Sequence, residues 1–469
     1  MHAHTPRERT GSQSGGRAGE LSRKSTSIIG RDVLLGILRF GIGVFVARIL
    51  GPIGFGSWAM LELITNYLRV FGAPRFEIAC VNFLGRRRYD RGEVMFLTNL
   101  IAVVMGLVWL GAVFVARDRL QAILFRQFEV STPLIVATAC YLPLLFVVRN
   151  YMYFLLSLED IASFNALQII QDVTRNALTV LLLLILTDKL WALPISAVTS
   201  GALATLYGAV KVHRVQRMGR EASWRLAREM LGFSATVYVG EAVGFLNLYA
   251  SNLLTGLYLP PSAMAFLSVG KGKAELLNQI STAVSTVLYP VISNRERKPV
   301  DAEAVTTRAF RLCLIVLSGF GLLGIALAYP LIVTLYGWRF APAATAFCIV
   351  IPGVVIQGAA NVQRQYFVAM GRPDLPLKIA VPPLALQAIA CVVLIPRLGF
   401  GGAALAASVA LIVSGILYVA AYRQFAGTSY REMLVPKRED FVWIGHRAKE
   451  LFGSFRCTCG RPIAWWQDA

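Results

Sequence analysis

Charged side chains stand inside two consecutive apolar segments near the start of the chain. The segments span residues 27–71 and contain Arg31, Arg39, Glu62 and Arg69. A charge near the centre of a bilayer costs about 2.5–3.5 kcal/mol on insertion scales, so it normally faces a protein interior or a water-filled cavity. Arginine in such a cavity suits an anionic ligand, because its guanidinium forms two parallel hydrogen bonds to phosphate oxygens. Residues 27–71 are therefore predicted to form one wall of a polar pathway.

The spacing of these charges indicates which of them share a face. Arg31 and Arg39 are about 80° apart around a helix, and Glu62 and Arg69 are only about 20° apart. Arg39 lies roughly ten residues from the inner end of its helix, near the midplane of a bilayer. Two interpretations of Arg39 stay open: a ligand for an anion, or the ion-pair partner of Glu62. Arg48 points away from Arg39 and is predicted to reach the lipid headgroups.

The second half of the chain repeats this concentration of charge in its first two apolar segments. Glu241 lies near the middle of the segment 231–258, and the segment 262–292 carries Lys271, Lys273 and Glu275. We expect Lys271 and Lys273 to join the three arginines in a cationic cavity. Lys271 and Glu275 are four residues apart, so an intrahelical ion pair is the alternative.

Three carboxylates are candidates for coupling transport to a proton or cation. They are Glu62, Asp172 and Glu241. A carboxyl group can exchange a proton near neutral pH when it is partly buried, but these groups could equally serve to neutralise nearby arginines. Asp172, for example, is three residues from Arg175 on one predicted helix, a spacing at which the two side chains can pair.

Signals for an enzyme or a metal site are weak. The four histidines lie in the N-terminal tail, one connector and the C-terminal tail, so none can act as a base within the membrane. Cys457 and Cys459 with His446 form an incomplete zinc-ligand pattern that we interpret as unliganded tail residues. No Walker A or dinucleotide loop is present. We therefore expect neither an enzyme nor a bound metal or cofactor.

The composition is that of a polytopic membrane protein. Hydrophobic residues make up 56% of the 469 positions and charged residues 15%, and apolar runs of helix length recur from residue 27 to 422. The net charge of +20 does not indicate nucleic-acid binding, because most Lys and Arg residues fall in every second connection between the apolar runs. This bias predicts twelve transmembrane helices with both termini in the cytoplasm and the lipid bilayer as a partner.

The domain organisation follows from the longest basic connection. Residues 1–26 are predicted to be a disordered cytoplasmic tail and 423–469 a second tail. The connector 211–230 separates helices 1–6 (27–210) from helices 7–12 (231–422). Ala59-Met60 recurs as Ala263-Met264, and Tyr153-Phe154 as Tyr366-Phe367. The fold expected is all-α, with two six-helix lobes related by a pseudo-two-fold axis along the membrane normal and the transport route between them.

A set of short motifs resembles a known transporter family. In order along the chain they are residues 47–52 (ARILGP), 55–56 (FG), 335–337 (LYG), 340–343 (FAPA), 370–373 (MGRP) and 395–406 (IPRLGFGGAALA). Together they resemble the polysaccharide-transporter branch of the multidrug/oligosaccharidyl-lipid/polysaccharide exporter superfamily. The resemblance covers about residues 27–422, although many members have fourteen helices against the twelve predicted here.

The resemblance implies a flippase that moves polyprenyl-diphosphate-linked oligosaccharides across a bacterial inner membrane by alternating access. Such units serve O-antigen, capsule or exopolysaccharide synthesis, with a polysaccharide polymerase and export proteins as further partners. The resemblance also implies a cationic cavity, which Arg31, Arg39, Arg69, Lys271 and Lys273 match by helix position. Two alternatives remain. A multidrug or cation exporter would share the fold, and a membrane oligosaccharide polymerase or ligase would need a longer outer loop than this sequence has.

Overall fold

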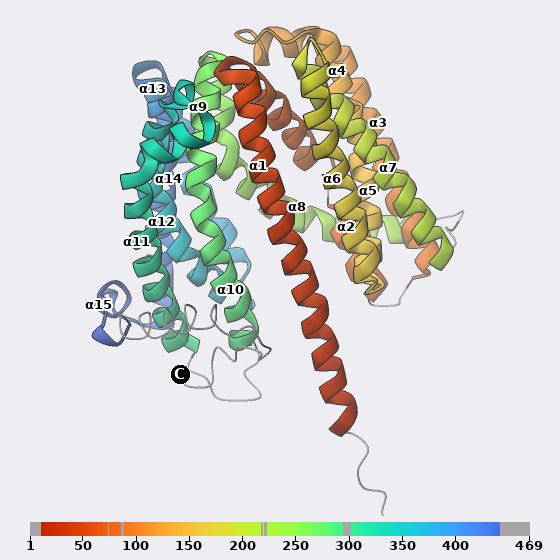
Figure 1. The fold of residues 1–469 in the computed structure, drawn as a ribbon. Helices are drawn as coiled ribbons and strands as arrows, with labels where there is room; N and C mark the ends of the chain where they lie inside the picture. The colour runs from red at the N-terminus through yellow and green to blue at the C-terminus, as the bar shows by residue number, and fades with distance from the viewer. Residues whose placement is uncertain are drawn as a thin grey trace, which may run out of the picture. The chain divides into compact units, whose positions relative to one another are not determined.

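Helices make up the regular structure of the part of the chain that the structure describes, with no strand among those residues (Figure 1). The computed structural model describes residues 11–73, 75–85, 89–216, 219, 223–293 and 302–440. Ten helical segments within these ranges are long and apolar enough to cross a membrane. The predicted all-α polytopic membrane fold is therefore confirmed.

The helices have the following bounds. In the first half they are α1 (Gly11–Phe71), α2 (Phe76–Gly85), α3 (Arg91–Leu124), α4 (Thr132–Ala139), α5 (Tyr141–Ser157), α6 (Ile161–Ile185) and α7 (Ala192–Val215). In the second half they are α8 (Trp224–Tyr258), α9 (Pro261–Ala274), α10 (Asn278–Ser293), α11 (Ala302–Tyr336), α12 (Ala343–Ala369), α13 (Asp374–Leu398), α14 (Phe400–Ala426) and α15 (Tyr430–Leu434). Short 3₁₀ turns are η1 (Lys189–Trp191), η2 (Glu275–Leu277) and η3 (Trp338–Phe340).

A bend at Gly51 divides α1 into two arms. Gly51 has φ 66° and ψ −179°, a conformation that is essentially restricted to glycine. Pro52 then starts the second arm, where its fixed φ and missing N–H cost nothing. The candidate span Gly30–Phe71 thus contains two of the predicted helices. The predicted helix 262–292 corresponds to α9, η2 and α10, so the ten candidate spans and this broken helix together account for the twelve predicted segments.

Two elements differ from the sequence-based expectation. The helix α1 already begins at Gly11, within the segment predicted to be a disordered tail. The helix α2 lies after the apolar segments predicted at 27–71 and was not among the predicted helices. It forms because Phe76, Ala79 and Phe83 give it a face that is buried in the core. The arginines that follow it, at positions 86–88, lie outside the described residues.

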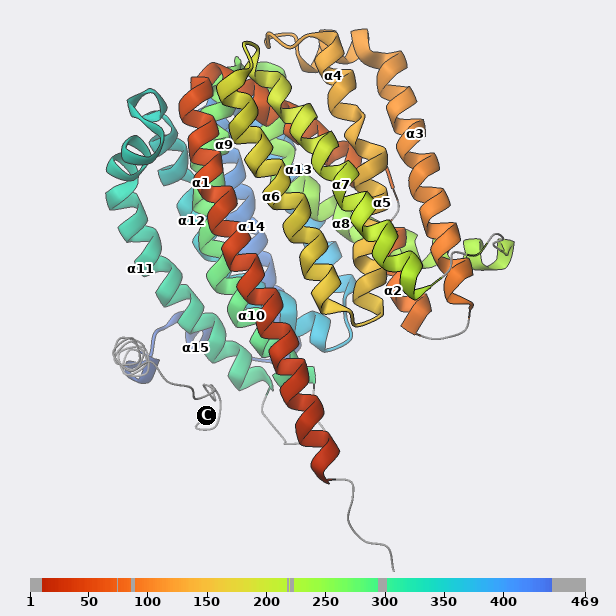
Figure 2. The same ribbon diagram turned by 45° about the vertical axis from the view of Figure 1, so that its right-hand side comes forward.

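The chain forms two compact units that are interleaved in sequence. The first contains the described parts of 1–272 with 327–349 and 384–407, and the second contains those of 273–326, 350–383 and 408–469. In the first unit α5 packs against α2, α3 and α7, and α6 packs against α1 and α7; Figures 1 and 2 show α3, α5, α6 and α7 running alongside one another. The helix α8 follows the connector 211–230 in sequence, yet it packs on α1, α2 and α3, which precede the connector. The domain boundary at 211–230 therefore stays a prediction.

Aromatic residues on α12 and α14 form part of the core of the second unit. Tyr366 and Tyr422 meet edge to face with ring centroids 5.1 Å apart. Both hydroxyl groups donate to Glu303 on α11, Tyr366 to Oε1 at 2.8 Å and Tyr422 to the carbonyl oxygen at 2.9 Å. The buried rings therefore fix three helices without leaving their polar ends unsatisfied.

Candidate substrate and ion site

Two ion pairs connect α6 to the two arms of α1. Arg39 on the first arm pairs with Asp172, and Glu62 on the second arm accepts a hydrogen bond from Arg175 Nη2 at 3.1 Å. The open alternative that paired Arg39 with Glu62 is wrong for this structure, as is a hydrogen-bonded pair of Asp172 with Arg175. The reason is geometric: Asp172 and Arg175 lie one turn apart on the face of α6 that packs against α1, so each finds a closer partner there.

Arg31, eight residues before Arg39 on α1, adds another contact with α6. The charged row on α1 and α6 thus consists of Arg31, Asp32, Arg39, Glu62, Asp172 and Arg175. The Arg31 side chain is only 5% exposed, and its Nη1 donates to Asn165 Oδ1 on α6 at 2.7 Å while its Nη2 donates to Asp32 Oδ1 at 2.7 Å. The guanidinium carbon lies 4.8 Å from the ring centroid of Phe164, a distance at which a cation is attracted to the ring face. Arg31 is thus held by the protein, whereas the Arg39 side chain is 53% exposed.

The charges of this row are balanced. Three arginines, Arg31, Arg39 and Arg175, meet three carboxylates, Asp32, Glu62 and Asp172. In this conformation the row does not carry the surplus of positive charge expected of an open anion site. An anion that binds at this row has to compete with the carboxylates that already hold the arginines.

A second charged cluster lies where the end of α1 meets α2, α5 and α8. Glu77 Oε1 accepts hydrogen bonds from Arg75 Nη1 and from Arg149 Nη2, each at 2.8 Å, and Arg75 also pairs with Glu241. Arg69, whose Nε donates to Asn66 Oδ1 at 3.2 Å, lines a small cavity together with Glu77 and Arg149. The volume of this cavity is about 20 Å³, enough for about one water molecule. Three arginines outnumber two glutamates in this cluster.

Three residues of this cluster were missed by the sequence-based selection. They are Arg75, Glu77 and Arg149. Arg149 is a lone charge in an apolar run, the same signal that selected Arg39. Arg75 and Glu77 lie just after the apolar segments of residues 27–71, and only the formation of α2 brings them into the protein interior. The predicted candidates Arg69 and Glu241 join this cluster and not the row on α6.

Of the two predicted lysines, Lys271 belongs to the first compact unit. Lys271 on α9 is 3% exposed and donates to Ser251 Oγ at 2.9 Å, to Asn252 Oδ1 at 3.1 Å and to the carbonyl of Leu248. Its ammonium is therefore enclosed by oxygen atoms of α8. Lys273 belongs to the second compact unit, so its relation to the arginines stays a prediction.

Arg48 contacts backbone and not headgroups. Its guanidinium donates to the carbonyl oxygen of Leu335, at 2.7 Å from Nε, and to that of Thr334. These carbonyls belong to the last turn of α11, where the helix provides no backbone N–H groups to bind them. The predicted role of Arg48 as a headgroup anchor is therefore wrong for this structure. The described residues contain no cluster of three or more potential metal ligands, and Cys457, Cys459 and His446 lie outside them.

Comparison with known proteins identifies the family. Residues 45–345 match the sequence profile of a family described as polysaccharide biosynthesis protein, and this match covers more than half of the chain. The chain belongs to this family. No curated protein matches the chain in sequence.

Three solved structures illustrate what this chain resembles in fold. The lipid II flippase MurJ in an inward closed conformation has a TM-score of 0.67 at 14% identity, covering 92% of this chain and 94% of MurJ. An inward-facing multidrug resistance MATE transporter of the MOP superfamily has 0.69 at 12% identity, covering 84% and 94%. The MATE transporter VcmN of Vibrio cholerae in its bent form has 0.54 at 14% identity, covering 89% and 98%. At these identities the likeness shows that the chain shares their fold.

Proposed function

We propose that this chain is a flippase that moves polyprenyl-diphosphate-linked oligosaccharide units across the bacterial inner membrane, with both termini in the cytoplasm. The family supplies the link to polysaccharide biosynthesis, and the fold is that of transporters, among them a lipid II flippase. The product would pass to a polysaccharide polymerase and export proteins for O-antigen, capsule or exopolysaccharide synthesis. The alternative of a membrane-bound polymerase or ligase has no support from these relatives.

The proposal is carried by the first arm of α1, which has one exposed apolar face and one exposed charged face. Leu34 and Ile37 are 64% and 67% exposed and form an apolar face that suits lipid tails. Asp32 and Arg39, about 20° apart on another face, are 55% and 53% exposed. Exposed charges on a membrane-spanning helix are tolerated where they face water or a polar ligand. This charged face of α1 is therefore the surface offered to the diphosphate.

Arg39 can bind the diphosphate by exchanging one anionic partner for another. Its guanidinium is held by Asp172 in the row on α6. A pair of diphosphate oxygens can accept two parallel hydrogen bonds from a guanidinium and carries more negative charge than a carboxylate, so it can replace Asp172. Arg175, which is 29% exposed and held by Glu62, is placed to act in the same way.

The exchange also supplies a route to ion coupling. Asp172, once separated from Arg39, would be a largely buried carboxylate without its cation, so another cation or a proton could take the place of the guanidinium. Glu62 stands in the same relation to Arg175, and Glu241 to Arg75. We propose that proton uptake by one of these carboxylates accompanies binding of the anionic substrate.

The multidrug or cation exporter remains the second candidate. It is favoured by the MATE likeness and by the equal number of carboxylates and arginines in the row on α6. A cation would then bind Asp172 and Glu62 in place of the arginines. Uptake of a cationic dye by inverted membrane vesicles, set beside flipping of a labelled polyprenyl-diphosphate oligosaccharide in proteoliposomes, separates the two functions.

The decisive variant is Arg39→Ala. Flipping should fall at least tenfold at normal membrane abundance, since an exposed ion pair contributes only about 0–1 kcal/mol to stability. Arg39→Lys should recover part of the rate, because an ammonium keeps the charge but loses the bidentate geometry. The matched control is Arg397→Ala, which removes an exposed arginine near the end of α13 and should leave flipping unchanged.

A double variant tests whether Arg39 acts on the ligand or only on its neighbour. If Arg39 served only to neutralise Asp172, then Arg39→Ala with Asp172→Asn would restore export, because no unpaired carboxylate remains. Under the proposal the double variant stays inactive. Restored export would therefore contradict diphosphate binding by Arg39.

A further inference from the structure

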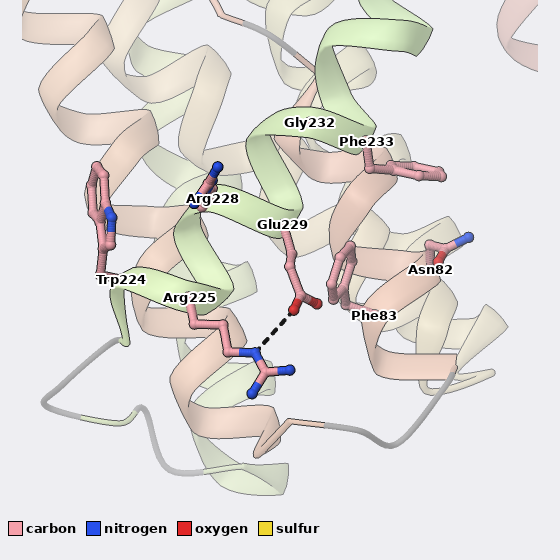
Figure 3. A pocket seen from close by; sticks show the side chains of 8 residues that line it. All are labelled: Asn82, Phe83, Trp224, Arg225, Arg228, Glu229, Gly232 and Phe233. Atoms are coloured by element: carbon pink, nitrogen blue, oxygen red, sulfur yellow. Dashed lines mark hydrogen bonds and ion pairs between the residues drawn. The ribbon is translucent and has the colours of Figure 1, made fainter.

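An open pocket lies between α2 and the first turns of α8, apart from the charged row and the second cluster. Its volume is about 720 Å³, within the range of about 300–1,000 Å³ usual for ligand pockets. Figure 3 shows Asn82 and Phe83 on α2 facing the part of α8 that carries Glu229 and Phe233. The rings of Phe83 and Phe233 meet edge to face at 6.4 Å. One wall of the pocket is thus aromatic.

The other wall is basic and exposed. Trp224 is 81% exposed, and the side chain of Arg225 is 72% exposed. Arg225 Nε donates to Glu229 Oε1 at 3.2 Å, the contact drawn in Figure 3, so the one carboxylate that lines the pocket is already matched. Arg228 is exposed and has no ion-pair partner among the described residues. The pocket therefore presents a net positive charge beside an indole ring.

The first turns of α8 have the pattern of a helix at a membrane surface. Leu226 and Met230 are fully buried in the core of the first unit. Trp224, Arg228 and Leu231 follow one another on the opposite, exposed side, within about 60° of each other. Tryptophan and arginine side by side are typical of the headgroup level, where the ring lies among acyl chains and the guanidinium meets phosphate. Because α8 is itself a candidate membrane span from Trp224 onward, its first residues stand where such headgroups are present.

We propose that this pocket binds the headgroup phosphate of an anionic phospholipid. Arg228 and Arg225 would hold the phosphate, Trp224 would pack on the glycerol and first acyl carbons, and the Phe83–Phe233 wall would border the headgroup. The Cβ position of Gly232, which also lines the pocket, meets no atom within 4 Å. A larger side chain introduced at Gly232 would therefore extend into open space. This site does not depend on the substrate proposed above.

The test measures lipid adducts on the full-length protein by native mass spectrometry, after purification from nanodiscs of phosphatidylcholine with one fifth phosphatidylglycerol. Wild-type protein should retain phosphatidylglycerol in preference to phosphatidylcholine. Each of Arg225→Gln and Arg228→Gln should lower the retained anionic lipid by about fivefold, the contribution of one basic residue near an anionic surface. Gly232→Leu should lower it without loss of melting temperature, since it fills open space and replaces a helical glycine. Glu229→Gln should raise it.

The control is Arg214→Gln, which removes an exposed charge from the end of α7 without touching the pocket. A loss as large as that of Arg228→Gln would show general attraction to the surface and would overturn a site. Retention unchanged by Gly232→Leu would also overturn it. Inorganic phosphate added at 10 mM should not displace the lipid; full displacement would assign the pocket to free phosphate instead.

Discussion

At the scale of single residues, the partner of each charge decides what it can do. Arg31 and Lys271 are almost completely buried and bonded on several sides, so a ligand could reach them only after helices separate. Arg39 and Glu62 are about half exposed and each has one carboxylate or guanidinium partner. The energy needed to exchange such an exposed partner is small, about 1 kcal/mol or less. The exposed pairs are therefore the ones suited to bind and release a ligand.

Lys271 offers a test of this distinction. Lys271→Met should lower the melting temperature of the detergent-solubilised protein, because the hydrogen-bond acceptors of Ser251, Asn252 and Leu248 lose their donor. Leaving a buried polar group unsatisfied costs about 1–3 kcal/mol. Lys378→Met, which removes an exposed lysine paired with Asp374, is the control and should change the melting temperature little. Normal stability of Lys271→Met together with lost flipping would instead support the ligand role predicted from the sequence.

At the scale of elements, the helices could be predicted because each apolar run is long enough to cross a membrane on its own. One exception is α2, whose ten residues are too few to span a membrane and become helical because the core buries Phe76 and Phe83. The positions of Arg39, Glu62 and Asp172 on their helices were also predictable. Their pairing was not, because it depends on which face of α6 packs against α1, and no local spacing encodes that contact.

The bend of α1 is an element-level feature with a single-residue cause. Gly51→Ala should destabilise the protein by about 1–3 kcal/mol, since a side chain at φ 66°, ψ −179° is strained. It should also disturb the two ion pairs with α6, because the bend aims the second arm and Glu62. Gly43→Ala is the matched control: it lies within the helix with no atom within 4 Å of its Cβ and should be neutral or stabilising. Thermal melting and export, measured for both variants, check this, and equal melting temperatures would remove the argument for a strained bend.

At the scale of the whole molecule, the compact units differ from the two halves of the sequence. The halves were predicted from equal helix counts and a basic connector, which reflect topology and ancestry. Packing follows buried surface instead: α8 lies after the connector, yet it packs on α1, α2 and α3. The backbone N–H of Gly219 in the connector also donates to the carbonyl of Gly92 at 2.9 Å. The first compact unit is therefore completed by residues from the second half of the chain.

This difference predicts how fragments behave. A fragment of residues 1–218 lacks α8 and α9 and should be degraded when it is expressed alone, because the surfaces of α1, α2 and α3 that pack against α8 are left uncovered. A fragment of residues 1–297 retains α8 and α9 and should accumulate in the membrane at several times that level. Co-expression of 1–218 with 219–469 should restore abundance and export, since α8 returns in the second piece. Immunoblots of membrane fractions compare the three cases at matched transcript levels. Equal accumulation of the two single fragments would contradict the packing argument and would favour two halves that fold independently.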